Sequence, residues 1–232
     1  MTRDSGGGLH LRSILFAAVV GLAGVGVLVA LGIWQLQRLA WKEELIARIE
    51  AVMTDAPAAL PAAPDPRRDR YRAIALSGHF TGRQTRVLTS VPDRGPGYSL
   101  IAAFATGDGR VILLERGYIP DLVAVPPPPP AGELRVTGNL DWPDDLTPGM
   151  EAHDAARDIW IGHDLPGLAA QLDALPLLVI ARTATGDDIT PVPVTAALRN
   201  DHLGYAITWF GLALAWAGMT GAWLWRIRAG RS

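Results

Sequence analysis

The sequence predicts a membrane protein of the α+β class, in which two transmembrane helices flank a periplasmic, antiparallel-sheet-rich domain with minor helices. Three observations predict this architecture. Residues 13–37 and residues 203–225 contain no charged side chain over 25 and 23 consecutive positions. The short tails beyond these stretches are basic, and the long segment between them alternates apolar runs with turn residues. The 232 residues therefore allow one membrane-anchored domain of ordinary size.

The first apolar stretch predicts a transmembrane helix over residues 13–34, preceded by a tail of residues 1–12. About 20 apolar residues cross a bilayer at about 1.5 Å per residue. Arg3 and Arg12 precede the stretch, but it is longer than the core of a signal peptide, and "LGIWQLQR" has no small-x-small cleavage site. We therefore expect an uncleaved anchor. Nothing resembles an Arg- and Ser-rich transit peptide, which favours a bacterial protein.

The segment between the spans, residues 35–202, predicts the periplasmic α+β domain. Helical periodicity continues past the first span to about Val52, and the proline-rich residues 55–66 follow as an extended linker. A second helix is expected near residues 165–172. Strands are predicted by short apolar runs at residues 71–80, 85–91, 98–105, 110–119, 133–140 and 177–181.

Two short motifs predict the connections in this domain. Asp108-Gly109 is typical of a tight hairpin turn between the third and fourth strands. The proline run in residues 125–132 favours a stiff spacer over a ligand for a partner domain.

The second apolar stretch predicts a transmembrane helix over residues 203–225, followed by a tail of residues 226–232. Both tails are basic, and the positive-inside tendency places basic flanks in the cytoplasm. We therefore expect a multi-pass protein of the bacterial inner membrane with both termini cytoplasmic and residues 35–202 periplasmic. Small residues four apart favour packing between the spans, namely Ala17 and Gly21 on the first and Ala213, Ala217 and Gly221 on the second.

Composition and motifs exclude several classes of function. Residues 35–204 hold 16 Lys and Arg against 22 Asp and Glu, which argues against a nucleic-acid partner. The chain has no cysteine, so it offers no thiol nucleophile or thiolate metal site. There is no G-x-S-x-G motif and no histidine pair at zinc-binding spacing, so we do not expect an enzyme. His153 and His163 lie in an acidic stretch that allows either a metal site or, as we favour, an ordinary solvated loop.

Ionisable and aromatic residues gather where both spans meet the predicted periplasmic surface. His202, Tyr205 and Trp209 are spaced i, i+3 and i+7, which places them on one helix face. Interfacial tryptophan, tyrosine, arginine and lysine are common at any bilayer rim. An ionisable histidine in the first turn of a span is a candidate functional residue. On the first span and just beyond it, the rim residues are Trp34, Arg38, Trp41 and Lys42.

This set of side chains suits a haem. A neutral imidazole ligates haem iron, aromatic side chains cover the macrocycle, and arginine or lysine pairs with the propionates. His202 is the candidate iron ligand, and a single histidine leaves the second axial position open.

Four blocks of the sequence resemble the surfeit locus protein 1 family. The blocks are "LGIWQLQRLAWKEELI", "SGHF", "GPGYSLIAAFATGDGRVILLERGYIP" and "NDHLGYAITWF". The matching positions in the first and last blocks are Gly32, Trp34, Gln35, Arg38, Trp41, Lys42, Asn200, His202, Leu203, Tyr205, Ala206, Thr208, Trp209 and Phe210. The sequence departs from the family pattern at Glu115 and Asp201, where asparagine is frequent, and at Tyr118, where tryptophan is usual. Asp201 could raise the basicity of the neighbouring imidazole or alter its tautomer.

The resemblance implies a non-enzymatic assembly factor for haem-copper cytochrome c oxidase. It implies that His202 binds haem a transiently at the periplasmic membrane rim and that the protein assists haem insertion into subunit I. The implied partners are cytochrome c oxidase subunit I and haem a synthase, in addition to membrane lipid. The alternative is a scaffold that stabilises unassembled subunit I without binding haem.

Overall fold

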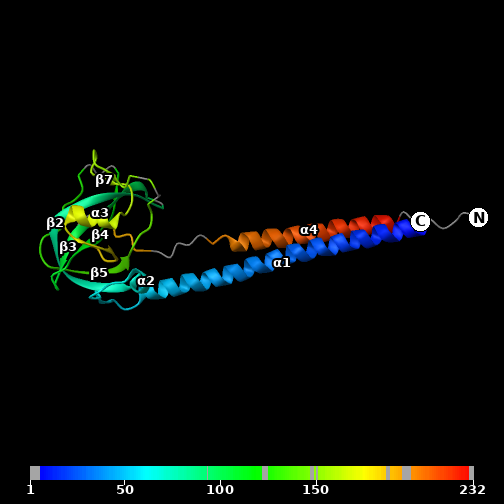
Figure 1. Ribbon diagram of the computed structural model, residues 1–232, viewed down its shortest axis with the longest axis horizontal. Coiled ribbons are helices and arrows are strands. Elements are labelled where there is room, and N and C mark those ends of the chain that lie inside the picture. Colours follow the sequence, from blue (N-terminus) through cyan, green and yellow to red (C-terminus); the bar gives the residue numbers. More distant parts are fainter. Residues whose placement is uncertain are drawn as a thin grey trace, which may run out of the picture. The chain divides into compact units, whose positions relative to one another are not determined.

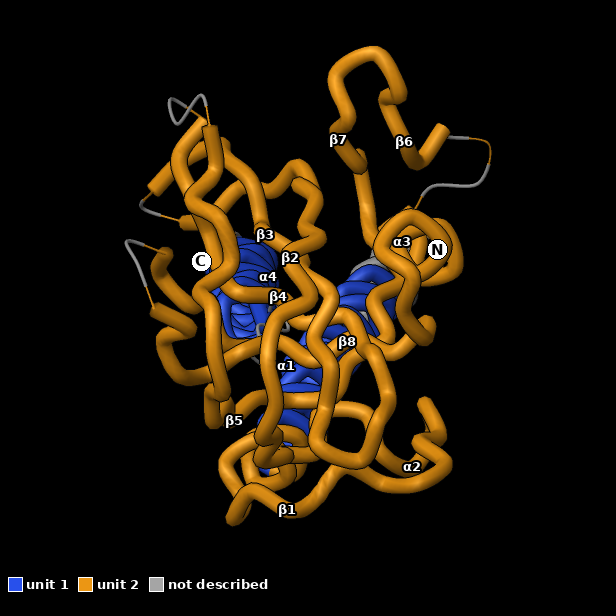
Figure 2. Tube along the Cα trace, turned by 90° about the vertical axis from the view of Figure 1, so that its left-hand side faces the viewer, with its two compact units in different colours: residues 1–47, 197–232 blue, residues 48–196 orange. Residues whose placement is uncertain are grey.

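The computed structural model describes residues 6–92, 94–121, 125–146, 149, 151–186, 189–194 and 200–229. The chain forms two compact units. One unit combines Met1–Ala47 with Ala197–Ser232, and the other is Arg48–Ala196 (Figure 2). The first unit therefore joins the two ends of the chain, and the second is continuous in sequence.

The first unit contains two long helices, α1 (Gly6–Thr54) and α4 (His202–Ala229), as Figure 1 shows. Both are long and apolar enough to cross a membrane, and few side chains of their most apolar windows are buried within the protein. The core helix of a soluble domain would bury such side chains, so the two predicted apolar helices are confirmed. Helix α1 continues without a break past residue 34 to Thr54, as the amphipathic pattern predicts.

The two helices pack in antiparallel directions through small residues of α1. Gly21 faces Thr220, Gly24 faces the indole of Trp216, and Gly32 faces the ring of Phe210. As the residue number increases along α1, the number of the contacting residue on α4 decreases, so the two helices run antiparallel. The buried positions between the helices are Ala17, Gly21, Gly32 and Gln35 on α1 and Ala206 and Ala213 on α4.

The prediction of the packing residues is right for α1 and partly wrong for α4. Ala17, Gly21 and Ala213 are buried, whereas Ala217 and Gly221 are exposed. The reason is that the small residues of α1 accommodate large side chains of α4. A second row of small residues on α4 is therefore unnecessary for close packing.

The second unit is built on a ring of five long strands. Each strand pairs with two neighbours, in the order β2, β3, β4, β8, β5 and back to β2. The ring is closed, so these strands present no free long edge. All pairings are antiparallel except the parallel pair β4–β8. The strands are β2 (Ala73–Val91), β3 (Gly95–Thr106), β4 (Val111–Pro120), β5 (Leu134–Asp141) and β8 (Leu175–Ala181).

Shorter elements complete this unit. Strands β1 (Ala58–Ala59) and β7 (Ile159–Trp160) run parallel to β2, and β6 (His153–Asp154) pairs with β7. Helix α2 spans Pro66–Asp69 and helix α3 spans Leu165–Leu172. The domain is sheet-rich with minor helices, as predicted, but its sheet is mixed.

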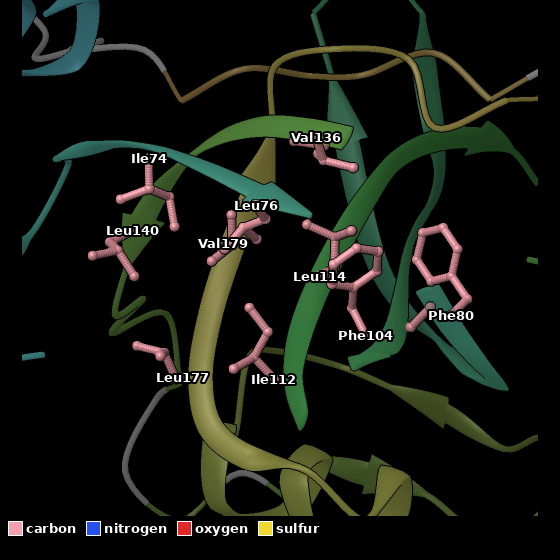
Figure 3. Close-up of a cluster of buried hydrophobic side chains, with 12 residues drawn as sticks. Ile74, Leu76, Phe80, Phe104, Ile112, Leu114, Val136, Leu140, Leu177 and Val179 are labelled. Atoms are coloured by element: carbon pink, nitrogen blue, oxygen red, sulfur yellow. The ribbon is translucent and has the colours of Figure 1, made fainter. Parts of the chain in front are cut away.

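The long strands are apolar on both faces because each face packs against a different core. Alternate residues of β3, β4 and β8 point to opposite sides of the sheet. Phe104, Leu114 and Val179 belong to the inner cluster drawn in Figure 3. Their neighbours Ala103, Leu113 and Leu178 belong to an outer cluster, which includes Trp160 and the buried residues of α3. A strand buried on both faces reads as a continuous apolar run.

The predicted strands 71–80 and 85–91 form one strand, β2. The residues between them suggest a turn, but the pairing of β2 with β3 shifts register between Phe80 and Gln84 and then continues. Gly82 has a φ of +91°, a backbone conformation that glycine adopts readily in a bulge. The hairpin at Asp108-Gly109 is confirmed, since Gly109 has a φ of +86° and the Thr106 N–H donates to the Arg110 carbonyl.

The predicted linker contains regular structure. Its Ala58 and Ala59 form β1, and at its end Asp65 caps helix α2 by accepting hydrogen bonds from the backbone N–H groups of Arg67 and Arg68. Asp65 followed by Pro66 is a typical helix start. Prolines alone do not reveal the pairing of β1 with β2, because that pairing depends on tertiary structure.

Candidate functional site

His202 is the first residue of α4, and its imidazole contacts a side chain of α1. The Nδ1 atom of His202 lies 2.7 Å from Oε1 of Gln35. An amide oxygen only accepts hydrogen bonds, so this contact is a hydrogen bond in the tautomer whose proton is on Nδ1. Nε2 of a neutral imidazole then keeps its lone pair, which is the form that ligates a metal.

Gln35 is a partner that the sequence did not reveal as such. It lies between the two helices and is only 8% exposed. Asp201, which the sequence suggested as the residue that tunes His202, is exposed, and the Nδ1 contact is made with Gln35. One signal was available: Gln35 follows Gly21 by 14 residues and Gly32 by three, so it continues the glycine face of α1.

The aromatic residues of the predicted site lie on one side of the helix pair. Val20 of α1 and Trp216 and Trp223 of α4 line one cavity of about 350 Å³, which identifies this side on both helices. Helix residues spaced 7, 11 or 14 apart share a face, since 3.6 residues make one turn. By this spacing Trp34 lies on the same face of α1 as Val20. On α4, Tyr205 lies on the same face as Trp216, and Trp209 lies on the same face as Trp216 and Trp223.

The remaining predicted residues lie further along α1. Arg38 and Trp41 follow Gln35 by one and nearly two turns and thus extend past the first residue of α4. The Arg38 guanidinium lies 4.0 Å from the centre of the Trp41 ring, a cation–π contact. Lys42 is partly buried. The site is therefore an open surface on one side of two helices, with Trp34 and Tyr205 each more than half exposed.

Asn200 belongs to the motif that includes His202 but was not among the predicted ligand-binding residues. Its Oδ1 atom is buried and accepts no hydrogen bond from any residue that the structure describes. Such an orphaned acceptor beside His202 is suited to a hydrogen-bond donor of a ligand or partner.

His163 lies outside this region and forms a partly buried ion-pair cluster, in which the Asp145 side chain is 46% exposed. Its Nδ1 lies 2.6 Å from Asp145 Oδ2, and its Nε2 lies 3.6 Å from Glu115 Oε2. Burial opposes the imidazolium, but the hydrogen bond with Asp145 and the nearby carboxylate of Glu115 outweigh it and raise the pKa of His163 to about 10. The His163 side chain is 15% exposed, so the expectation of a solvated loop is wrong there.

The acidic stretch offers no metal site within the part of the chain that the structure describes. No group of three His, Asp or Glu residues among the described positions could hold a metal ion. His153 stacks on Trp160 with ring centres 4.5 Å apart, and its Nε2 lies 3.3 Å from Asp158. Its ring therefore packs against β7.

The block ending in "RGYIP" contains a buried arginine that is held by hydrogen-bond acceptors. Arg116 is fully buried, and its guanidinium donates to the Gln84 amide oxygen at 2.7 Å and to the carbonyls of Pro127 and Pro128. The proline run, expected to be a spacer, thus also supplies acceptors to a buried arginine. Charge in a core requires such partners.

The comparisons with known proteins cover both units. The model of the SURF1 family matches residues 22–214. A SURF1-like protein of Monosiga brevicollis is 30% identical over 204 residues, which cover 78% of this chain and 77% of that protein. Surfeit locus protein 1 of Xenopus tropicalis is 29% identical over 209 residues, 79% of this chain and 67% of that protein. A SURF1-like protein of Rickettsia felis is 29% identical over 200 residues, 80% and 87% of the two chains. The chain therefore belongs to the SURF1 family.

Proposed function

We propose that this protein is an assembly factor for haem-copper cytochrome c oxidase, which binds haem a at the membrane rim and assists its insertion into subunit I. Membership of the SURF1 family supports the assembly role. The observation that carries the haem proposal is the 2.7 Å distance between His202 Nδ1 and the amide oxygen of Gln35, because a hydrogen bond donated by Nδ1 leaves Nε2 available to iron.

The other residues around His202 fit a haem as cargo. Trp34, Tyr205 and Trp209 would cover the apolar macrocycle from one side of the helix pair, with Trp41 at its end. Arg38 and Lys42 would pair with the anionic propionates, as arginine and lysine do with carboxylates. Haem carries an apolar ring with an anionic edge, so the boundary between lipid and water suits it.

The open character of the surface suits a carrier. With one histidine as ligand and with exposed aromatic side chains, haem would be held by few contacts and released to an acceptor. In this proposal haem a synthase supplies the haem and subunit I receives it, while membrane lipid surrounds both helices.

An optical spectrum of the purified full chain, co-expressed with haem a synthase, tests the proposal. The parent should carry a haem a spectrum, and His202→Ala should lose or shift it. His79→Ala is the matched control, since His79 lies on β2 with its side chain 54% exposed, and it should keep the spectrum. Pure parent protein without haem would overturn the carrier function and leave the scaffold for subunit I as the better explanation.

The membrane orientation is part of the same proposal, with residues 35–202 periplasmic and both tails cytoplasmic. The chain has no cysteine, so single cysteines report on their own surroundings. A membrane-impermeant maleimide applied to intact cells should label Val125→Cys, whose native side chain is 81% exposed, and not Thr2→Cys. The reverse labelling would contradict this orientation.

A further inference from the structure

We propose that Gln35 is the positioning residue of His202, selecting the tautomer of its imidazole and thereby making it a ligand. Gln35 would not touch the haem iron. It would act through His202, by holding the proton on Nδ1 and leaving the lone pair on Nε2. The inference deepens the proposed function and rests on it.

The geometry supports a specific contact. The Nδ1–Oε1 distance of 2.7 Å is at the short end of the range for N–H···O hydrogen bonds. Gln35 is 8% exposed, and its contact with His202 links two residues that are 167 positions apart in the sequence. Water therefore competes weakly for this amide, and the hydrogen bond is correspondingly strong.

The position of Gln35 on α1 fixes the amide in place. Gly32, one turn earlier on the same face, lies against the ring of Phe210, and a Cβ at Gly32 would come within 2.7 Å of that ring. This close approach of the two helices determines how far the Gln35 side chain must reach to meet His202. The hydrogen bond thus depends on the helix packing and in turn orients the imidazole.

A purely structural role for Gln35 makes different predictions. A hydrogen bond between membrane helices stabilises their association whichever partner donates. A positioning role requires an acceptor at this place, because a donor would move the imidazole proton to Nε2 and abolish ligation. Gln35→Glu keeps an acceptor of the same length, and Gln35→Met keeps the length and removes the acceptor.

The first measurement is the ¹⁵N NMR spectrum of the full chain in detergent micelles, with labelled histidine and without haem. The His202 signals are assigned by their loss in His202→Ala. We expect a protonated Nδ1 and a bare Nε2 in the parent and in Gln35→Glu, and loss of this preference in Gln35→Met. A parent spectrum with the proton on Nε2 overturns the inference, since Gln35 would then be the donor.

The second measurement is a titration of the same proteins with iron protoporphyrin IX as the probe. Loss of a partner that orients a metal-binding histidine lowers affinity about 10- to 100-fold. We expect this loss in Gln35→Met and near-parental affinity in Gln35→Glu. Disulfide formation between Gly21→Cys and Thr220→Cys in the Gln35→Met background verifies that the helices still pack.

The outcomes separate the two claims. Equal affinity of the parent and Gln35→Met, with the same tautomer in both, overturns the positioning role and leaves haem binding by His202 intact. Absence of His202-dependent probe binding in the parent overturns the proposed function itself, and the positioning role with it.

Discussion

Nε2 of His163, which lies between β7 and α3, is 3.6 Å from the carboxylate of Glu115 on β4. The other carboxylate oxygen of Glu115 accepts a hydrogen bond from Ser99 on β3. The Nδ1 of the same imidazole binds Asp145, whose pKa the hydrogen bond from His163 lowers. One partly buried histidine therefore contacts β4 and the loop that follows β5 directly, and β3 through Glu115.

This cluster predicts that the sheet domain loses stability in mild alkali. His163 has a pKa of about 10 in the folded chain and about 6.5 when unfolded. A pKa that is raised by folding stabilises the folded state. This stabilisation is complete at a pH below the pKa of the unfolded chain and disappears as the pH rises from about 6.5 to about 10. Hydrogen exchange of β4 in the full chain should show falling protection over this range.

The matched variants are His163→Gln and His79→Gln. His163→Gln removes the titrating group and should flatten the alkaline dependence while lowering stability at pH 7, because Glu115, whose side chain is only 12% exposed, is left without its cation. His79→Gln changes an exposed histidine of the same domain and should retain the parental slope. An unchanged slope in His163→Gln would rule out this origin.

The buried carboxylate of Asp69 predicts a loss of stability in acid. Hydrogen bonds from Arg68 outweigh burial and lower the pKa of Asp69 to about 2, with further help from Arg72 and the Asp65 N–H. A pKa that is lowered by folding stabilises the folded state at a pH above the unfolded pKa of 3.8. This contribution disappears as the pH falls toward 2. Asp69→Asn should lower the free energy of unfolding at pH 7 by about 1–3 kcal/mol.

Urea unfolding of the full chain measures this change in free energy. The unfolding is monitored by hydrogen exchange in peptides from β2 and β5. Asp173→Asn is a suitable control, because the Asp173 side chain is 83% exposed. Equal destabilisation by both variants would contradict a special role for the buried carboxylate.

The packing of α1 on α4 predicts a specific disulfide. A Cβ atom at Gly21 would lie 3.1 Å from Cβ of Thr220, so Gly21→Cys with Thr220→Cys, which removes the overlapping methyl group, should oxidise after a small shift of the helices and lose reactivity toward a maleimide. No described residue of α4 lies within 4 Å of a Cβ atom at Gly26, so Gly26→Cys with Thr220→Cys should stay reduced. Free thiols in both pairs would mean that the helices do not pack this way.

The surroundings of Gly117 predict that even an alanine side chain at this position strongly lowers the free energy of unfolding. Its φ is +136°, and a Cβ atom would lie 2.6 Å from the carbonyl carbon of Thr190 and 2.8 Å from Cα of Pro191. Gly117→Ala should therefore lower the free energy of unfolding by about 3 kcal/mol or more, from strain and overlap together. Gly82 also has a positive φ but open space around it, so Gly82→Ala should cost only about 1 kcal/mol.

The comparison of these two variants isolates the close approach. Urea midpoints of the full chain in detergent give both values under one set of conditions. If the two substitutions cost the same, the contact of β4 with residues 190–191 does not constrain the chain.

Local patterns in the sequence predicted the local features of the fold. The charge-free runs gave the two long helices, and Asp108-Gly109 gave a hairpin, because each depends on residues that are neighbours in the chain. Closure of the sheet was not predictable in this way. It needs Ile112 to pair with Leu175, and an apolar strand does not specify a distant partner.

The candidate site follows the same division. Helical spacing placed Tyr205 and Trp209 on one face of α4 from the sequence alone. Gln35 was missed as the partner of His202 because the contact depends on how two helices associate, which the periodicity of either helix does not contain. The partly buried environment of His163 was missed for the same reason, since Glu115 lies far from it in the sequence.

The two-sided burial of β3, β4 and β8 has a consequence for errors in folding. In most sheets a slip of one residue exposes the apolar face to water, and this penalty fixes the register. Here a slip would exchange the inner and outer clusters, so a mispaired sheet would remain compact and dry. Among the described residues, several fit one register and would reject a slip, including Gly78 against the Ala105 carbonyl, Gly138 against the Ile180 carbonyl, and Arg116 at its proline carbonyls. Substitutions at these positions should therefore produce a misassembled domain that exposes little apolar surface to a chaperone or protease.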